Sequence, residues 1–169
     1  MALTPSTMLP LQHMAPDFNL LDVMHQENIS LTELKGTKGT LVVFMCNHCP
    51  FVIHLLEHFN RLADELKPQG IATIAISSND IENYPQDGPQ QMVALCKEYG
   101  ISFPYLYDPT QEVAKAYDAA CTPDFYLFDD ESKLVYRGRY DASRPQSSTP
   151  ITGEDLKNAA LNLIHKKPI

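Results

Sequence analysis

The sequence predicts an α/β fold in which helices flank a mixed central sheet. Residues 40–45 and 71–77 are continuous apolar runs rich in β-branched side chains, the pattern of strands buried on both faces. Between them, residues 51–67 repeat apolar side chains at helical spacing, and a connection of that length suits a right-handed parallel crossover. Residues 122–129 and 133–141 have the pattern of two strands joined by a tight turn, which adds an antiparallel pair.

The other segments continue this alternation of strands and helices. Strands are predicted at residues 18–23 and 102–108, and helices at residues 91–100, 110–119 and 152–166. Pro68 and Gly70 end the helix at residues 51–67, and Thr152 is the expected N-cap of the last helix. The inner face of the helix at residues 51–67 is predicted to consist of Val52, Leu55, Leu56, Phe59, Leu62, Ala63 and Leu66. The predicted order is β-β-α-β-α-β-α-β-β-α.

Length, charge and composition limit the class of protein. The 169 residues are predicted to form one domain, residues 1–169, in which residues 1–15 are an irregular N-terminal arm. The formal net charge of −8 disfavours a nucleic-acid partner, because binding to phosphates depends on Lys and Arg. No stretch approaches the ~20 apolar residues of a membrane-spanning helix. The N-terminal segment lacks the basic residues and the apolar core of a secretory signal, so we expect a cytoplasmic protein.

A C-x-x-C motif, Cys46 to Cys49, lies between the buried strand at residues 40–45 and the helix that follows it. Two thiols at this spacing can form a metal ligand pair, a structural disulfide or a reactive dithiol. A reducing compartment disfavours the structural disulfide. The carboxyl ends of the strands in an open α/β sheet are the usual place for a functional site, and a helix N-terminus stabilises a thiolate.

Position within the motif suggests a role for each side chain. Cys46 lies on the turn, where we expect it to be the more exposed sulfur and the attacking nucleophile. Cys49, one turn deeper, is expected to resolve the mixed disulfide. His48, as an imidazolium between them, would favour the thiolate and make the disulfide more oxidising. Pro50 suits the first turn of the helix, because its missing N–H costs nothing there.

Four stretches of the sequence follow a known pattern: "APDFNL" and "ISLTELKG", "CNHCP" after an apolar strand, and "FPYLYDPTQEVAKAYDAACTPDFYLFD". In these stretches the chain resembles the redoxin branch of thioredoxin-fold proteins, which includes the AhpC/TSA (peroxiredoxin-like) and TlpA-like thiol-disulfide proteins. The resemblance implies a thioredoxin-like fold with an N-terminal β extension and an insertion of the redoxin type. It also implies that the Thr122–Pro123 bond is cis and that Pro123 faces the cysteines. The catalytic residues expected are Cys46, Cys49, His48, Thr122 and Pro123, with no cofactor and no metal.

Several positions depart from the patterns of this family. Counted back from Cys49, the proline and the threonine of the peroxiredoxin signature are replaced by Val42 and Cys46. Thr40 stands where thioredoxin has a buried Asp, and Val52 stands where TlpA-like reductases often have a Glu. Both familiar proton acceptors are therefore missing, and no residue is predicted as the general base.

Three functions are compatible with these residues. The leading prediction is a thiol-disulfide oxidoreductase that reduces or exchanges disulfides of proteins or small molecules, with an unidentified thiol as its reductant. A thiol-dependent peroxidase of the AhpC/TSA type would use Cys46 or Cys49 as its peroxidatic residue. A metal-binding module would combine Cys46, Cys49 and Cys121. Cys121 is equally open to explanation as a third redox thiol or as a small buried apolar residue.

Weaker patterns lie outside the motif. Cys96 lies among apolar helix residues and is predicted to belong to the core. His54 and His58 have the spacing of metal ligands, but the polar residues beside them favour a solvated helix face. The polar segment at residues 84–88 is a candidate for framing the site. The candidates for a docking surface, or for a solvated strand edge, are Arg137, Arg139 and Arg144.

Overall fold

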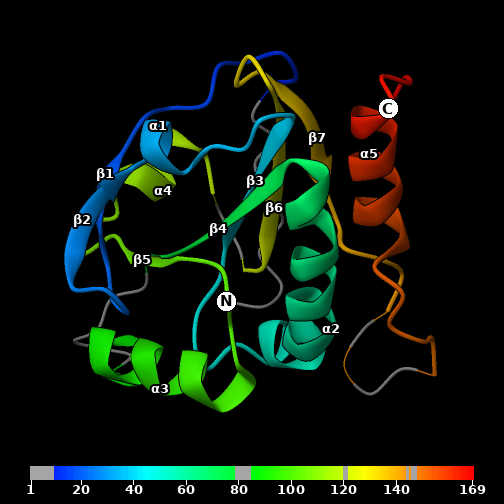
Figure 1. Ribbon diagram of the computed structural model, residues 1–169. Coiled ribbons are helices and arrows are strands. Elements are labelled where there is room, and N and C mark those ends of the chain that lie inside the picture. Colours follow the sequence, from blue (N-terminus) through cyan, green and yellow to red (C-terminus); the bar gives the residue numbers. More distant parts are fainter. Residues whose placement is uncertain (1–9, 79–84, 120–121, 144, 146–147) are drawn as a thin grey trace.

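The computed structural model describes residues 10–78, 85–119, 122–143, 145 and 148–169. Within these ranges, helices cover both faces of a seven-stranded sheet (Figure 1). The strands are β1 (Asn19–Asp22), β2 (Glu27–Ser30), β3 (Gly39–Phe44), β4 (Ile71–Ser77), β5 (Tyr105–Tyr107), β6 (Asp124–Asp129) and β7 (Leu134–Gly138). The α-helices are α1 (Leu31–Leu34), α2 (Pro50–Leu66), α3 (Pro89–Tyr99), α4 (Glu112–Ala116) and α5 (Glu154–Ile164), and the 3-10 helices are η1 (Lys67–Gln69) and η2 (Pro85–Asp87).

The strand order β2-β1-β5-β4-β3-β6-β7 places β3 near the centre of the sheet. β3 is parallel to β4 and antiparallel to β6. Phe44, the last residue of β3, pairs with Ile76 of β4 and with Asp124 of β6. The segments that follow β3 and β4 and the segment that precedes β6 therefore meet at one end of the sheet. This end carries the C-x-x-C motif.

Two apolar layers enclose the sheet. On one face, Leu41 and Val43 of β3 share a buried cluster with Phe59 of α2 and with residues of α3 and α5. On the other face, Val42 and Phe44 belong to a second cluster that includes residues of α1 and α4. Successive side chains of a strand point to opposite faces, so β3 is buried on both sides and its side chains are nearly all apolar.

Helix α2 positions the motif and is the best predicted element of the chain. Pro50 occupies its first turn, as expected. Every apolar residue predicted for its inner face is buried. Each such Leu or Phe side chain contributes about 1.5–3 kcal/mol to stability when fully buried. η1, which contains Pro68, and Gly70 in the left-handed region at φ 95° end the helix where the sequence predicts.

The α/β class and the mixed sheet are confirmed, but two local features differ from the prediction. Residues 27–34 form β2 and α1, which the alternation of strands and helices did not assign. β2 pairs with β1, and a capping box between Ser30 and Glu33 starts the short helix. Gly153, not Thr152, is the N-cap of α5. The reason is that the backbone N–H groups of Thr152 and Gly153 both donate to the carboxylate of Asp141. These hydrogen bonds fix the backbone ahead of the helix.

Residues 10–15 run beside the β6–β7 hairpin. Gln12 N–H donates to the Leu134 carbonyl at 2.7 Å, and Leu134 N–H donates to the His13 carbonyl at 2.9 Å. The rest of the predicted N-terminal arm lies outside the described residues. Among the helices described, none has the length and apolar character needed to cross a membrane.

Candidate active site

Cys46 and Cys49 lie in the short connection from β3 to α2, and Cys49 is the N-cap of α2. Both thiols are free. Cys46 is 1% exposed and Cys49 is 5% exposed, so the expectation that Cys46 is the more exposed sulfur is wrong for the reduced protein. The reason is that Cys46 follows the buried end of β3 closely and packs in the apolar cluster beneath α2.

The peptide bond between Thr122 and Pro123 is cis, as the family resemblance implied. Thr122 contacts both sulfurs. Cys46 Sγ lies 3.6 Å from Thr122 Oγ1, and Cys49 Sγ lies 3.5 Å from the Thr122 carbonyl oxygen. The topology accounts for these contacts, because β6 begins at Asp124 beside the end of β3. Residues 76 positions apart in the sequence are thus brought together.

The hydrogen bonds around the two sulfurs favour a thiolate at Cys49 over one at Cys46. The hydrogen bond donated by the Cys46 thiol has the largest effect on the pKa of Cys49, and it lowers that pKa. Burial opposes this effect, but Thr122 and the backbone N–H groups of Val52 and Phe51 also favour the thiolate, and the pKa of Cys49 falls to about 5. The same hydrogen bond, together with burial, raises the pKa of the Cys46 thiol far above its ordinary value.

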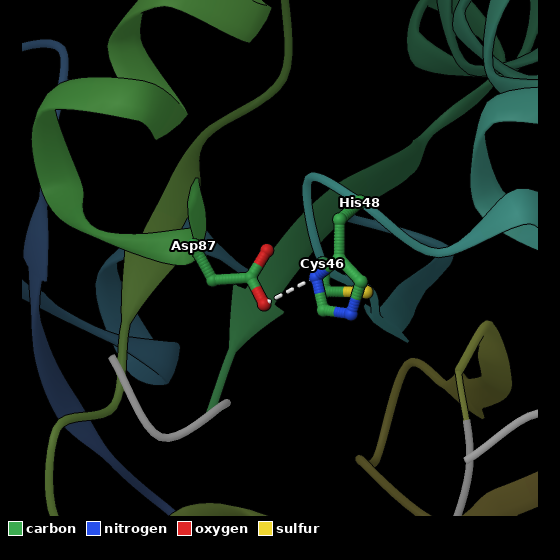
Figure 2. A group of neighbouring side chains, drawn as sticks. All are labelled: Cys46, His48 and Asp87. Atoms are coloured by element: carbon green, nitrogen blue, oxygen red, sulfur yellow. Dashed lines mark ion pairs between the residues drawn. The ribbon is translucent and has the colours of Figure 1, made fainter. Parts of the chain in front are cut away.

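Asp87 of η2 joins the motif from the other side (Figure 2). His48 Nδ1 lies 2.7 Å from Asp87 Oδ2, and the backbone N–H of Asn47 donates to Asp87 Oδ1 at 2.8 Å. Tyr105 of β5 donates its hydroxyl to Asn47 Oδ1 at 3.0 Å. One ligand atom from each of Cys46, His48 and Asp87 lies within 4.8 Å of the other two. A buried carboxylate therefore fixes both the backbone and the imidazole of the motif.

Asp87 has no individual role in the sequence prediction, although the structure places it in contact with the motif. It was only one member of a polar segment, residues 84–88, and it lies 40 positions from Asn47. The signal that could have identified it is topological. β4 is parallel to β3 and adjacent to it, so the segment after β4 must emerge at the same end of the sheet as the motif. Residue 84 itself lies outside the described residues.

The two positions where related proteins carry an acidic group do not supply a proton acceptor here. The Thr40 hydroxyl is buried and accepts a hydrogen bond from the Gly36 N–H at 3.1 Å. Val52 is buried in the apolar cluster beneath α2. His48, held by Asp87, is a titratable group that the fold places beside Cys46 instead.

Arg137 does not contribute to the docking surface considered from the sequence. Arg137 is buried, and its Nη2 lies 2.7 Å from Asp124 Oδ2. Asp124 is the residue that follows Pro123. Arg139 is exposed and pairs with Asp155 at 2.5 Å. Arg144 lies outside the described residues, and so does Cys121, the third cysteine of the proposed metal-binding module.

The polar face of α2 is less solvated than predicted. His54 Nε2 lies 3.1 Å from Ser143 Oγ, and His58 Nδ1 lies 2.6 Å from the Tyr140 hydroxyl. Burial lowers the pKa of His58. These contacts join α2 to the segment ahead of α5, so the two histidines have structural partners. Cys96 is buried in the core, as predicted.

A C-x-x-C pair at a helix N-terminus, a cis-proline loop against both sulfurs and this strand order define a thioredoxin-fold dithiol protein. The model of the AhpC/TSA family matches residues 11–137, and the chain belongs to this family. The thioredoxin domain of a thiol-disulfide oxidoreductase from Bacteroides vulgatus has the same fold, with a TM-score of 0.72 and 19% identity over 93% of this chain and 99% of that domain.

Further similar proteins include two relatives identified by sequence and two solved structures. Thiol-disulfide oxidoreductase ResA from Halalkalibacterium halodurans is 31% identical over 116 residues, and the ResA of Bacillus subtilis is 29% identical over 128 residues. The alignments cover 69% and 72% of this chain but only 61% and 63% of those relatives. An uncharacterized conserved protein from Geobacillus kaustophilus is 48% identical with a TM-score of 0.97, over 100% of this chain and 89% of that one. A hypothetical protein from Sinorhizobium meliloti is 41% identical with a TM-score of 0.95, over 98% of this chain and 90% of that one.

Proposed function

We propose that this protein is a thiol-disulfide oxidoreductase whose dithiol is Cys46 and Cys49. The observation that carries the proposal is a pair of free sulfurs at the N-terminus of α2, both in contact with Thr122. A thiolate can attack a substrate disulfide and form a mixed disulfide. A second thiol beside it can then attack that mixed disulfide and release the substrate. The name of the ResA relatives supports the same type of reaction.

The reaction has two exchange steps. In the first, the attacking thiolate forms a bond to one sulfur of the substrate disulfide, and the other substrate sulfur leaves as a thiolate and takes up a proton. In the second, the remaining cysteine loses its proton and attacks the mixed disulfide. The Cys46–Cys49 disulfide forms and the second substrate thiolate leaves. Two electrons pass from the dithiol to the substrate, and an external thiol must return them.

We propose the opposite order of attack to the one expected from the sequence, in which Cys46 attacks and Cys49 resolves. We assign the first attack to Cys49, because it is the N-cap of α2 and the hydrogen bond from the Cys46 thiol lowers the pKa of its thiol. Cys46 then has to lose its proton to resolve the mixed disulfide. His48, oriented by Asp87, is placed to accept that proton from Cys46.

The partners follow from this chemistry and remain proposals. The substrates are disulfides of proteins or of small molecules, and the reductant is a thiol. Because both sulfurs are nearly buried, the site must open to admit a substrate sulfur. The cytoplasmic location expected from the sequence also stays a prediction, which fractionation of cells that express the full gene would test.

The experiment that tests the proposal is reduction of insulin disulfides with dithiothreitol as the terminal reductant. We expect turnover with the wild type and with Cys96→Ala, a control that removes a buried thiol far from the motif in sequence. The variants Cys46→Ser and Cys49→Ser should lose turnover. If the wild type reduced insulin no faster than a variant that carries both Cys46→Ser and Cys49→Ser, the proposal would be wrong.

Peroxide reduction is a second candidate, favoured by membership of the AhpC/TSA family and by the position of Cys49 at the start of α2. Cys49 thiolate would attack hydrogen peroxide, form a sulfenic acid and release hydroxide. Cys46 would then attack that sulfur, form the disulfide and release water. Consumption of peroxide at a rate well above that of insulin reduction would place this reaction first.

A further inference from the structure

The cluster around Cys46 contains the three kinds of donor that zinc binds: a thiol, an imidazole and a carboxylate. Ligand atoms of Cys46, His48 and Asp87 lie within 4.8 Å of one another. We propose that the reduced protein binds one Zn²⁺ ion through Cys46, His48 and Asp87, with a solvent molecule as the fourth ligand. This set differs from the one considered from the sequence, which used Cys121.

The geometry is close to that of a bound ion. Tetrahedral zinc with bonds of about 2.0–2.3 Å has neighbouring donor atoms roughly 3.3–3.8 Å apart. The longest separation within the cluster is no more than 4.8 Å, so shifts of about 1 Å bring the three donors into range. His48 and Asp87 are already held together at 2.7 Å, and Asp87 is fixed further by the Asn47 N–H.

The charge balance also favours a cation. Asp87 is completely buried, and a buried carboxylate is costly unless positive charge compensates it. A Zn²⁺ ion supplies two positive charges beside this carboxylate and accepts all three donors. Soft thiolate and imidazole ligands select zinc over magnesium or calcium.

Binding of the ion depends on the redox state of the pair. When Zn²⁺ enters, the Cys46 thiol releases its proton to solvent and its sulfur becomes a ligand. A Cys46–Cys49 disulfide has no thiolate to offer, so oxidation must release the ion. Conversely, a bound ion occupies the Cys46 sulfur and blocks formation of the Cys46–Cys49 disulfide. The zinc site stands on donor geometry and does not require the proposed oxidoreductase function.

The test is titration of the reduced, chelator-treated protein with Zn²⁺ in competition with a chromogenic chelator, and with Co²⁺ as a spectroscopic probe. We expect one ion per chain, with sulfur-to-cobalt charge-transfer bands and the visible bands of tetrahedral cobalt. The protein oxidised to the Cys46–Cys49 disulfide should not bind. These readouts involve no disulfide substrate, so failure of the zinc site and failure of the proposed enzyme are distinguishable.

The variants His48→Ala and Asp87→Asn should each weaken Zn²⁺ binding about 10- to 100-fold. Asp22→Asn is the matched control, because Asp22 pairs with His25 at 2.8 Å in a second histidine–aspartate pair outside the thiol cluster. It should bind Zn²⁺ as the wild type does. The proposal is overturned if the reduced wild type does not bind one equivalent, if the disulfide form binds equally well, or if neither His48→Ala nor Asp87→Asn weakens binding.

Discussion

His48 Nδ1 lies 2.7 Å from Asp87 Oδ2, and this pair places an imidazole and a carboxylate beside the sulfur of Cys46. His48 comes from the motif itself, while Asp87 comes from the segment that follows β4. The two charges act on the dithiol in opposite directions. A cation near the sulfurs stabilises thiolate and hence the reduced form, and an anion destabilises both.

The redox potential should therefore respond oppositely to the two substitutions. His48→Ala should make the potential more negative, because it removes an imidazole whose protonated form stabilises the thiolate and hence the reduced form. His48 is partly exposed and a charge near a helix end contributes under ~1 kcal/mol, so the shift should not exceed about 20 mV. Asp87→Asn should make the potential less negative, because the charge of Asp87 raises the pKa of Cys46.

Titration against glutathione measures both potentials, and metal-free buffers keep the zinc site out of the result. Asp22→Asn again serves as the control and should leave the potential unchanged. Shifts in the same direction for His48→Ala and Asp87→Asn would show that the pair acts on the dithiol through packing and not through charge.

The thiolate of the reduced protein should appear at acid pH. The pKa of Cys49 is lowered to about 5, so the ultraviolet absorbance of one thiolate should rise as the pH increases through that value. Cys49→Ser should abolish this step. Cys46→Ser should keep it, since a serine hydroxyl can still donate a hydrogen bond to the Cys49 sulfur. A first thiolate that forms only above pH ~8, the range of an ordinary thiol, would refute the charge placement.

Arg137 and Asp124 form a buried ion pair at the start of β6, one residue after Pro123. Arg137→Met should lower the free energy of unfolding by about 3–5 kcal/mol, because it leaves a buried carboxylate without its partner. Arg139→Met is the matched control. Its exposed pair with Asp155 should contribute only about 0–1 kcal/mol. Urea denaturation compares the two, and equal losses would contradict the structure.

Asp141 should make stability depend on pH in the acid range. Burial opposes its charge, but hydrogen bonds from Ser143, Gly153 and Thr152 outweigh burial and lower its pKa below 3.8. A lowered folded-state pKa contributes stability above the ordinary carboxyl pKa, and this contribution is lost as the pH falls below it. Asp141→Asn should cost about 1–3 kcal/mol at neutral pH. Urea denaturation at neutral pH and near pH 3 should show this difference shrink in acid, and a constant difference would refute the assignment.

Local patterns predicted much of the fold. β3 and β4 were predicted from their apolar runs, because strands buried on both faces are almost entirely apolar. α2 was predicted from its amphipathic pattern, because a helix buried along one stripe has apolar residues at helical spacing. The β2 and α1 segment was missed, since each element is only four residues long and is stabilised by pairing with β1 and by a capping box.

The site was harder to predict than the fold, because its contacts join distant segments. The C-x-x-C motif is visible in the sequence itself, and the cis Thr122–Pro123 bond followed from family resemblance. The partnership of His48 with Asp87 and the burial of Arg137 did not, since each depends on which segments meet at one end of the sheet. The charge on Cys49 likewise depends on donors from Cys46 and from the first turn of α2, which the spacing of the motif alone cannot rank.

The most direct test of the central claim is to trap the mixed disulfide that each single-cysteine variant forms with a disulfide substrate such as native insulin. The dithiol mechanism predicts that Cys46→Ser accumulates a covalent adduct on Cys49, identified by peptide mass spectrometry, while Cys49→Ser accumulates little. The reverse pattern would return the first attack to Cys46. The absence of any adduct in both variants, with full turnover retained, would contradict a Cys46–Cys49 exchange mechanism altogether.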